Sequence, residues 1–144
     1  MKREDWLLLT VSAAGGTGLS PAQLQKCLFL LDTEIPGSFE TGSRYFFSAY
    51  NYGPFSKQIY DDAEFLAASG LLRIDRAAGR NYAEYSVTPL GMDSASKLRT
   101  WANQRSLTYL ETVVNWAKQR TFSELIRAIY NKYPAYRQNS VFQD

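Results

Sequence analysis

Three carboxylates, Asp61, Asp62 and Glu64, form the densest group of side chains in the sequence that could serve acid–base or metal chemistry. In a helix, adjacent positions such as 61 and 62 point about 100° apart, so two adjacent aspartates cannot converge on one ion. No later pair of carboxylates has the spacing of a recognised metal motif. We therefore interpret the group as an acidic helical surface and expect no metal site.

Other side chains that support catalysis are scarce. The sequence has no histidine, and its single cysteine, Cys27, lies among Leu24, Leu28 and Leu31 at helical spacing. A thiol in such a stripe behaves as a small apolar side chain. The usual general bases and nucleophile pairs are therefore missing. The sequence predicts a protein that is not an enzyme, with no catalytic residue and no cofactor.

Aromatic side chains are concentrated in residues 45–60, namely Tyr45, Phe46, Phe47, Tyr50, Tyr52, Phe55 and Tyr60. A strand alternates its faces, so it cannot bury all of them. We expect Phe47 and Phe55 in the core, whereas exposed tyrosines would act as anchors in a protein interface. Burial in the core is the alternative for each tyrosine. The predicted partner-binding residues are Tyr50, Tyr52, Ser56, Lys57 and Tyr60.

The charge distribution suggests a second function, DNA binding. Residues 1–96 carry 8 basic against 11 acidic side chains, and residues 97–144 carry 8 against 3, so the two parts have net charges of −3 and +5. Arg76 and Arg80 flank a predicted hairpin turn, where a wing would contact phosphates. However, residues 56–69 hold one lysine against three acidic side chains. An acidic helix is poorly suited to the major groove, and solvated basic surfaces are the simpler interpretation.

The elements that position these residues can be read from periodicity and capping signals. A chain of 144 residues with 45% hydrophobic side chains fits one domain. Ser20 before Pro21 and Thr121 before Glu124 are helix-start signals. Pro54 should end the pairing of a strand over 45–52, after which Ser56 caps a helix ending at Gly70. The predicted helices cover 2–14, 21–31, 56–69, 88–104, 106–118 and a segment from 121, where Phe122, Leu125, Ile126 and Ile129 should face inward.

A β-hairpin is predicted from residues 71–75 and 82–87, joined by a turn with Gly79. Three helices followed by a hairpin is the element order of a winged helix-turn-helix, here extended by three C-terminal helices. The expected fold is mostly α with this small hairpin, as a single domain over 1–144. The longest apolar run near the start, residues 6–9, is too short for a membrane span or a signal segment, so we expect a cytoplasmic protein without membrane partners.

Two short motifs carry a family resemblance. Leu24-Gln25-Lys26, followed about 30 residues later by Tyr52-Gly53-Pro54, resembles the Panacea (SocA-like antitoxin) domain and the related YwgA-like family of uncharacterised proteins. The resemblance covers about residues 19–140, and the segment 130–134 is more typical of the YwgA-like group. It implies a bacterial or phage protein with a winged-helix core. For the Panacea group it further implies an antitoxin that binds and neutralises a toxin.

Overall fold

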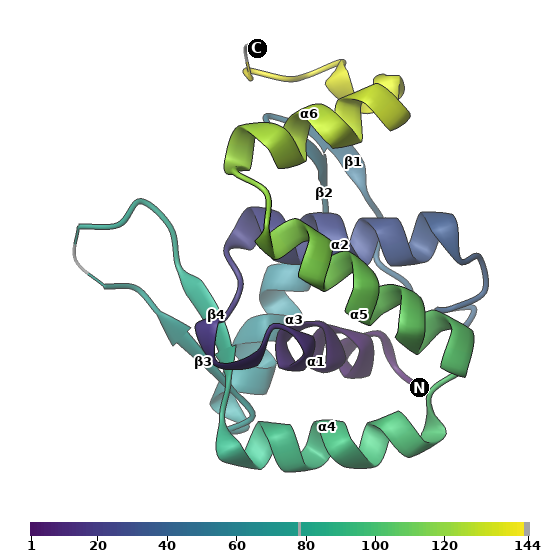
Figure 1. Ribbon diagram of the computed structural model, residues 1–144, viewed down its shortest axis with the longest axis vertical. Coiled ribbons are helices and arrows are strands. Elements are labelled where there is room, and N and C mark those ends of the chain that lie inside the picture. The colour runs from purple at the N-terminus through teal and green to yellow at the C-terminus, as the bar shows by residue number, and fades with distance from the viewer. Residues whose placement is uncertain (78, 143–144) are drawn as a thin grey trace.

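The computed structural model describes residues 1–77 and 79–142, and over this range the chain is mostly helical. Six α-helices and two antiparallel two-stranded hairpins account for most of the described residues (Figure 1). In chain order these elements are α1 (Arg3–Ala13), α2 (Pro21–Glu34), β1 (Ser48–Tyr50), β2 (Gly53–Phe55), α3 (Lys57–Ala68), β3 (Leu72–Asp75), β4 (Glu84–Val87), α4 (Pro89–Trp101), α5 (Gln104–Lys118) and α6 (Phe122–Lys132). Short 3₁₀ turns follow α1 (Gly15–Thr17) and α6 (Pro134–Arg137).

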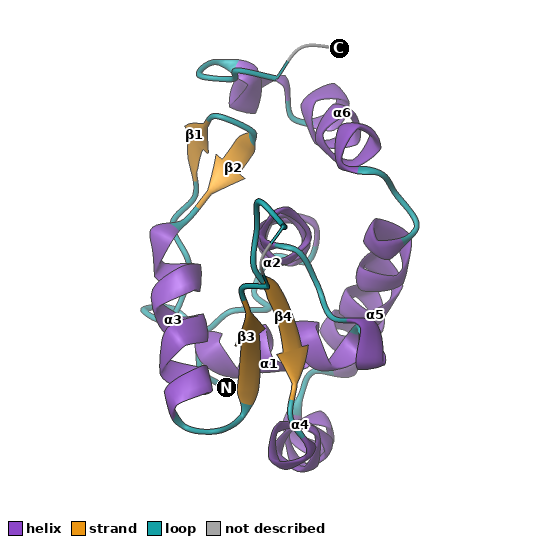
Figure 2. Ribbon diagram, turned by 90° about the vertical axis from the view of Figure 1, so that its left-hand side faces the viewer, coloured by secondary structure: helices purple, strands orange, loops and turns teal. Residues whose placement is uncertain are grey.

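The first two helices form the centre of the molecule. In Figure 2, α1 lies between α3 and α5, and α4 runs below it. Residues 6–12 of α1 and 24–31 of α2 are buried without interruption. Helix α1 is buried over these residues because α2, α3, α4 and α5 all pack against it. None of the helices in the described ranges is long and apolar enough to cross a membrane.

The predicted helix-start signals at Ser20 and Thr121 are confirmed, whereas Ser56 precedes α3 without a side-chain capping bond. The Ser20 hydroxyl accepts a hydrogen bond from the Gln23 backbone N–H, and the Gln23 side chain accepts one from the Ser20 N–H. Thr121 and Glu124 make the same reciprocal pair at the start of α6. The predicted helix 88–104 ends earlier, at Trp101, because Asn103 caps α5 by accepting from the Ser106 N–H. Helix α5 accordingly starts two residues before the predicted position.

The β1–β2 hairpin corrects the expectation for Pro54. This residue does not end the pairing but lies within β2, opposite Ala49. Both strands of a two-stranded hairpin are edge strands. Proline, which has no backbone N–H, can therefore occupy a position at which an N–H would point away from the partner strand. The turn between Tyr50 and Gly53 has only two residues, and Gly53 has φ +101°, a conformation that favours glycine.

The second hairpin, β3–β4, is confirmed and runs from Leu72 opposite Val87 to Asp75 opposite Glu84. Leu19, between α1 and α2, joins β4 through two backbone hydrogen bonds of 2.8 Å with Tyr85. Gly18 allows this approach, because a Cβ at its position would lie 2.7 Å from the Tyr85 carbonyl oxygen. The segment before α2 is thereby tied to the hairpin that extends from the body in Figure 1.

Candidate functional site

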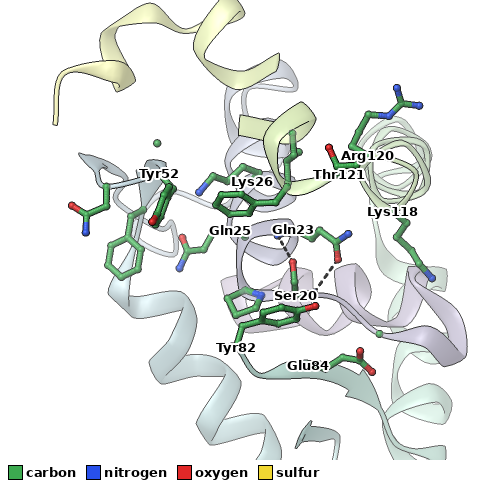
Figure 3. A pocket seen from close by; sticks show the side chains of 18 of the residues that line it. Ser20, Gln23, Gln25, Lys26, Tyr52, Tyr82, Glu84, Lys118, Arg120 and Thr121 are labelled. Atoms are coloured by element: carbon green, nitrogen blue, oxygen red, sulfur yellow. Dashed lines mark hydrogen bonds between the residues drawn. The ribbon is translucent and has the colours of Figure 1, made fainter. Parts of the chain in front are cut away.

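A cavity of about 670 Å³ lies where four segments distant in the sequence meet. It is bounded by the start of α2, the β1–β2 turn, the residues leading into β4, and the junction of α5 with α6 (Figure 3). The size is in the range of pockets that bind small molecules or a few side chains of a partner.

Aromatic side chains form the rim of this cavity. Tyr50, Tyr52, Tyr82 and Phe122 all line it and are 44–52% exposed. The Tyr52 and Phe122 rings meet edge to face with centroids 5.1 Å apart, so the β1–β2 turn and the start of α6 support each other across the opening. Exposed aromatic rings fixed by such contacts are typical of anchor positions in protein interfaces.

Tyr60 lies deeper in the cavity than the rim residues. Its ring is in contact with Phe55 and is stacked parallel to Tyr85, with centroids 5.5 and 6.4 Å away respectively. Burial raises the pKa of Tyr60. The structure therefore brings three of the predicted tyrosines, Tyr50, Tyr52 and Tyr60, to one pocket, with Tyr60 partly buried in its wall.

Lys26 is the unusual polar residue of the pocket. It lines the cavity, yet only 4% of its surface is exposed, and no hydrogen bond or ion pair connects it to any described residue. Its Cε carbon is 3.6 Å from the position that a Cβ on Gly53 would take, so the lysine stem passes directly beneath the hairpin turn. Burial lowers the pKa of Lys26 to about 8. The ammonium points toward the side of the cavity where Tyr52 lies (Figure 3).

Ser56 and Gln25 hold the two halves of the pocket together. The Gln25 side chain donates to the Ser56 carbonyl at 2.8 Å and accepts from the Ser56 N–H at 2.9 Å. Ser56 is only 2% exposed, and its hydroxyl makes no capping bond to the α3 backbone. The structure thus places Ser56 beneath the surface, where it joins α3 to α2 rather than facing a partner.

Lys57 and the three carboxylates of α3 are engaged in separate ion pairs. Lys57 lies on the surface 3.0 Å from Asp61, whereas Glu64 pairs with Arg76. Asp62 points inward, accepting from the Arg3 guanidinium at 2.9 Å and from the Tyr45 hydroxyl at 2.7 Å. The three carboxylates face three different directions. Within residues 1–77 and 79–142, no group of three or more metal-binding side chains converges.

The two hairpin arginines also have partners inside the protein. Arg76 donates to Glu64 at 2.5 Å, and Arg80 lies 3.4 Å from Asp75 and 3.9 Å from Glu84. In the C-terminal part, Lys118 donates to the carbonyl of Ala14 and the hydroxyl of Thr17, while Lys132 pairs with Glu34. These cations therefore help hold the fold together, and they point in different directions.

Cys27 is fully buried, as predicted. Burial raises the pKa of its thiol to about 12, so the thiolate that a nucleophile needs is disfavoured. It packs in the core and is not part of the pocket.

Most of the residues that line the pocket were not identified as binding residues from the sequence, and Tyr82, Phe122 and Lys26 are the most important of these. Phe122 was expected in the core, but it occupies the first turn of α6, where its ring faces the rim. Burial of Lys26 had a sequence signal, because Phe29 and Leu30 follow it at helical spacing on the side of α2 opposite to the predicted stripe. Because α2 has apolar side chains on opposite sides, it is buried on both sides, and Lys26 is buried with them.

Comparison with protein-family models gives no match, and a search of curated proteins also gives none.

Proposed function

We propose that this chain is a non-catalytic domain that recognises a partner protein through the aromatic-rimmed pocket. The observation that carries the proposal is the cavity of about 670 Å³ with four half-exposed aromatic side chains around its opening. A half-exposed Tyr or Phe gains buried area on association and loses little side-chain entropy. Four such rings around one concave site favour a partner that inserts side chains between them.

The motif resemblance gives this binding role a biological context. Gln25 belongs to the Leu-Gln-Lys motif and Ser56 follows the Tyr-Gly-Pro motif, and the two residues are joined by two hydrogen bonds. Lys26 and Gly53, from the same motifs, are neighbours, because the Lys26 Cε lies 3.6 Å from the position that a Cβ on Gly53 would take. The two motifs thus form one structural unit, which supports their joint use as a family signature. We therefore propose an antitoxin-like role, in which the domain binds and neutralises a toxin in the bacterial cytoplasm.

A winged-helix core is part of this proposal. The order α1, α2, α3, β3, β4, with the β1–β2 hairpin inserted between α2 and α3, supports it, as does the bridge between Leu19 and Tyr85, which joins the segment before α2 to the wing. The alternative function, DNA binding through Arg76 and Arg80, has less support. Both arginines are paired with carboxylates, and the exposed face of α3 presents Asp61 and Glu64. Phosphates would have to displace these pairs.

The proposal is tested with the protein encoded by the gene next to that of this chain. We expect co-expression of the chain to relieve growth arrest caused by that protein, and we expect the two purified proteins to bind. Tyr52→Ala should weaken the affinity, measured by calorimetry, by about 2 kcal/mol or more, while lowering the melting temperature far less than truncation of a core aromatic residue would.

Trp101→Ala is the matched control, because Trp101 is 80% exposed and is not among the residues lining the pocket. It should bind like the wild-type protein. Equal affinity of the wild-type, Tyr52→Ala and Phe122→Ala proteins would exclude the pocket as the binding surface. Absence of any complex with the neighbouring gene product would count against the antitoxin role.

A further inference from the structure

The floor of the pocket holds a positive charge that no other described residue neutralises. Lys26 is 4% exposed and has no hydrogen-bonding or ionic partner in the described ranges. An isolated ammonium in such a site has lost most of its hydration without gaining a counter-charge. A ligand that supplies an anionic oxygen at this position would restore both.

Two further cations, Lys118 and Arg120, are among the described residues that line the pocket, and the Arg120 Nε is also buried without a hydrogen-bond partner. Lys118 donates to Ala14 and Thr17, and the Arg120 guanidinium lies over the Trp116 ring with a separation of 5.8 Å. Figure 3 shows the cationic ends of Lys118 and Arg120 on the far side of the cavity, directed away from Lys26. Glu84, also in the lining, carries the opposite charge. A single positive charge on the floor matches a monovalent carboxylate better than a doubly charged phosphate.

The depth of Lys26 determines which kind of carboxylate can reach it. The rim rings are about half exposed, whereas the ammonium lies below them, under the turn at Gly53. A peptide main chain resting on the rim can send one side chain down between the rings. The flanking residues of that peptide would then contact Tyr50, Tyr52 and Phe122, which favours apolar or aromatic neighbours.

We propose that the pocket binds an acidic side chain, Asp or Glu, from an apolar or aromatic segment of the partner, and that Lys26 is the residue that recognises its carboxylate. This inference rests on the proposed function and names the chemistry of the bound segment. Burial of Lys26, which disfavours its charged form when the pocket is empty, means that the carboxylate both pairs with and stabilises the ammonium.

The test uses the full chain and three synthetic peptides as probes. NMR of the Lys26 side chain and calorimetry measure the binding of each peptide. The first is acetyl-Phe-Glu-Phe-amide, the second replaces Glu by Gln, and the third is the Gln peptide with a free terminal carboxylate. We expect the Glu peptide to shift the Lys26 Cε resonance and to bind about tenfold or more tightly than the amidated Gln peptide. The Gln peptide with a free terminus should resemble the amidated one.

Lys26→Met keeps the apolar stem and removes the charge, so it should lose the preference for Glu over Gln. Lys97→Met, at an exposed site on α4, should keep it. Melting temperatures verify that both variants are folded. Equal binding of the Glu and Gln peptides, no binding of either, or an unchanged preference in Lys26→Met would each overturn the proposal. Stronger binding of the free-terminus peptide would overturn the choice of a side-chain carboxylate.

The result of the peptide test can be distinguished from the result of the partner-binding test of the proposed function. If the partner still depends on Tyr52 while the peptides show no preference for a carboxylate, protein recognition by the rim stands and only the role of Lys26 fails. If the peptides show the preference but the neighbouring gene product does not bind, the carboxylate site stands and the antitoxin role fails.

Discussion

At the scale of single residues, Lys26 is the buried cation on which our proposed carboxylate site depends. Most buried lysines in proteins are paired, because an unpaired ammonium loses hydration on folding. Lys26 has no such pair in the described residues, and its stem is enclosed by α2 and the β1–β2 turn. For the stability of the fold alone, an apolar side chain of the same length would suit this position better than an unpaired lysine.

We predict that Lys26→Met increases the free energy of unfolding at pH 7. The folded protein holds the Lys26 proton with a pKa of about 8, against an ordinary value of 10.5 in the unfolded chain. Between these pH values the unfolded state binds more protons, so the wild-type protein becomes more stable as the pH rises from 8 to 10.5. The corresponding penalty below pH 8 is about 3 kcal/mol.

Urea unfolding of both proteins at pH 7 and pH 10 measures this effect. The difference between wild-type protein and variant should be largest at pH 7 and shrink at pH 10. Taking the difference removes the contributions of tyrosines such as Tyr85, which titrate in both proteins. A constant difference at the two pH values would show that the Lys26 ammonium is better hydrated than its burial implies.

At the scale of elements, two hydrogen bonds between Gln25 of α2 and Ser56 before α3, called the clamp below, hold one wall of the pocket in place. Gln25 satisfies the buried N–H and C=O of Ser56, two groups that water does not reach. Without the clamp, the junction between β2 and α3 would lose its attachment to α2, and the aromatic side chains of the hairpin would move relative to Lys26.

We predict that Gln25→Ala lowers the free energy of unfolding by about 2–4 kcal/mol, because two buried backbone groups lose their hydrogen bonds. Chemical denaturation measures the change. Gln104→Ala, at an exposed position in the first turn of α5, is the matched control and should change stability by less than about 0.5 kcal/mol. An effect of Gln25→Ala as small as that of the control would mean that water replaces the clamp.

The elements that could be predicted from the sequence are those whose signals are local. Ser20 with Pro21, and Thr121 with Glu124, specify helix starts through bonds within three residues. The prediction for Pro54 was wrong, because proline ends strand pairing only where the partner strand needs an N–H at that position. The pairing of β1 with β2 determines this, and the local sequence does not show it. The pocket depends on contacts over even larger separations, such as Tyr52 with Phe122, and no local pattern specifies these.

At the scale of the whole molecule, part of the positive charge of the C-terminal part of the chain is used in contacts with the N-terminal part. Lys132 pairs with Glu34, and Lys118 donates to the carbonyl of Ala14. The sequence suggested a basic region because it shows charges but not their partners.

We therefore predict that binding of the protein partner changes by less than about tenfold when NaCl is raised from about 50 to about 500 mM, since the rim contacts are apolar. Calorimetry over this range measures the dependence. Duplex DNA should not bind tightly at physiological salt. If DNA bound and this binding were lost in the double variant Arg76→Ala with Arg80→Ala, the wing would have to be the functional surface instead.

The pocket is assembled from segments between Thr17 and Leu125, and its hairpin wall is supported from behind by Val141, whose N–H donates to the Asn51 carbonyl. During synthesis on the ribosome, the aromatic residues of the hairpin therefore emerge long before the α6 residues that complete the opening. A nascent chain that displays Tyr50 and Tyr52 but still lacks α6 has no closed site. If the chain binds a partner through this pocket, as we propose, the complete binding site forms only after α6 and the segment behind the hairpin have left the exit tunnel.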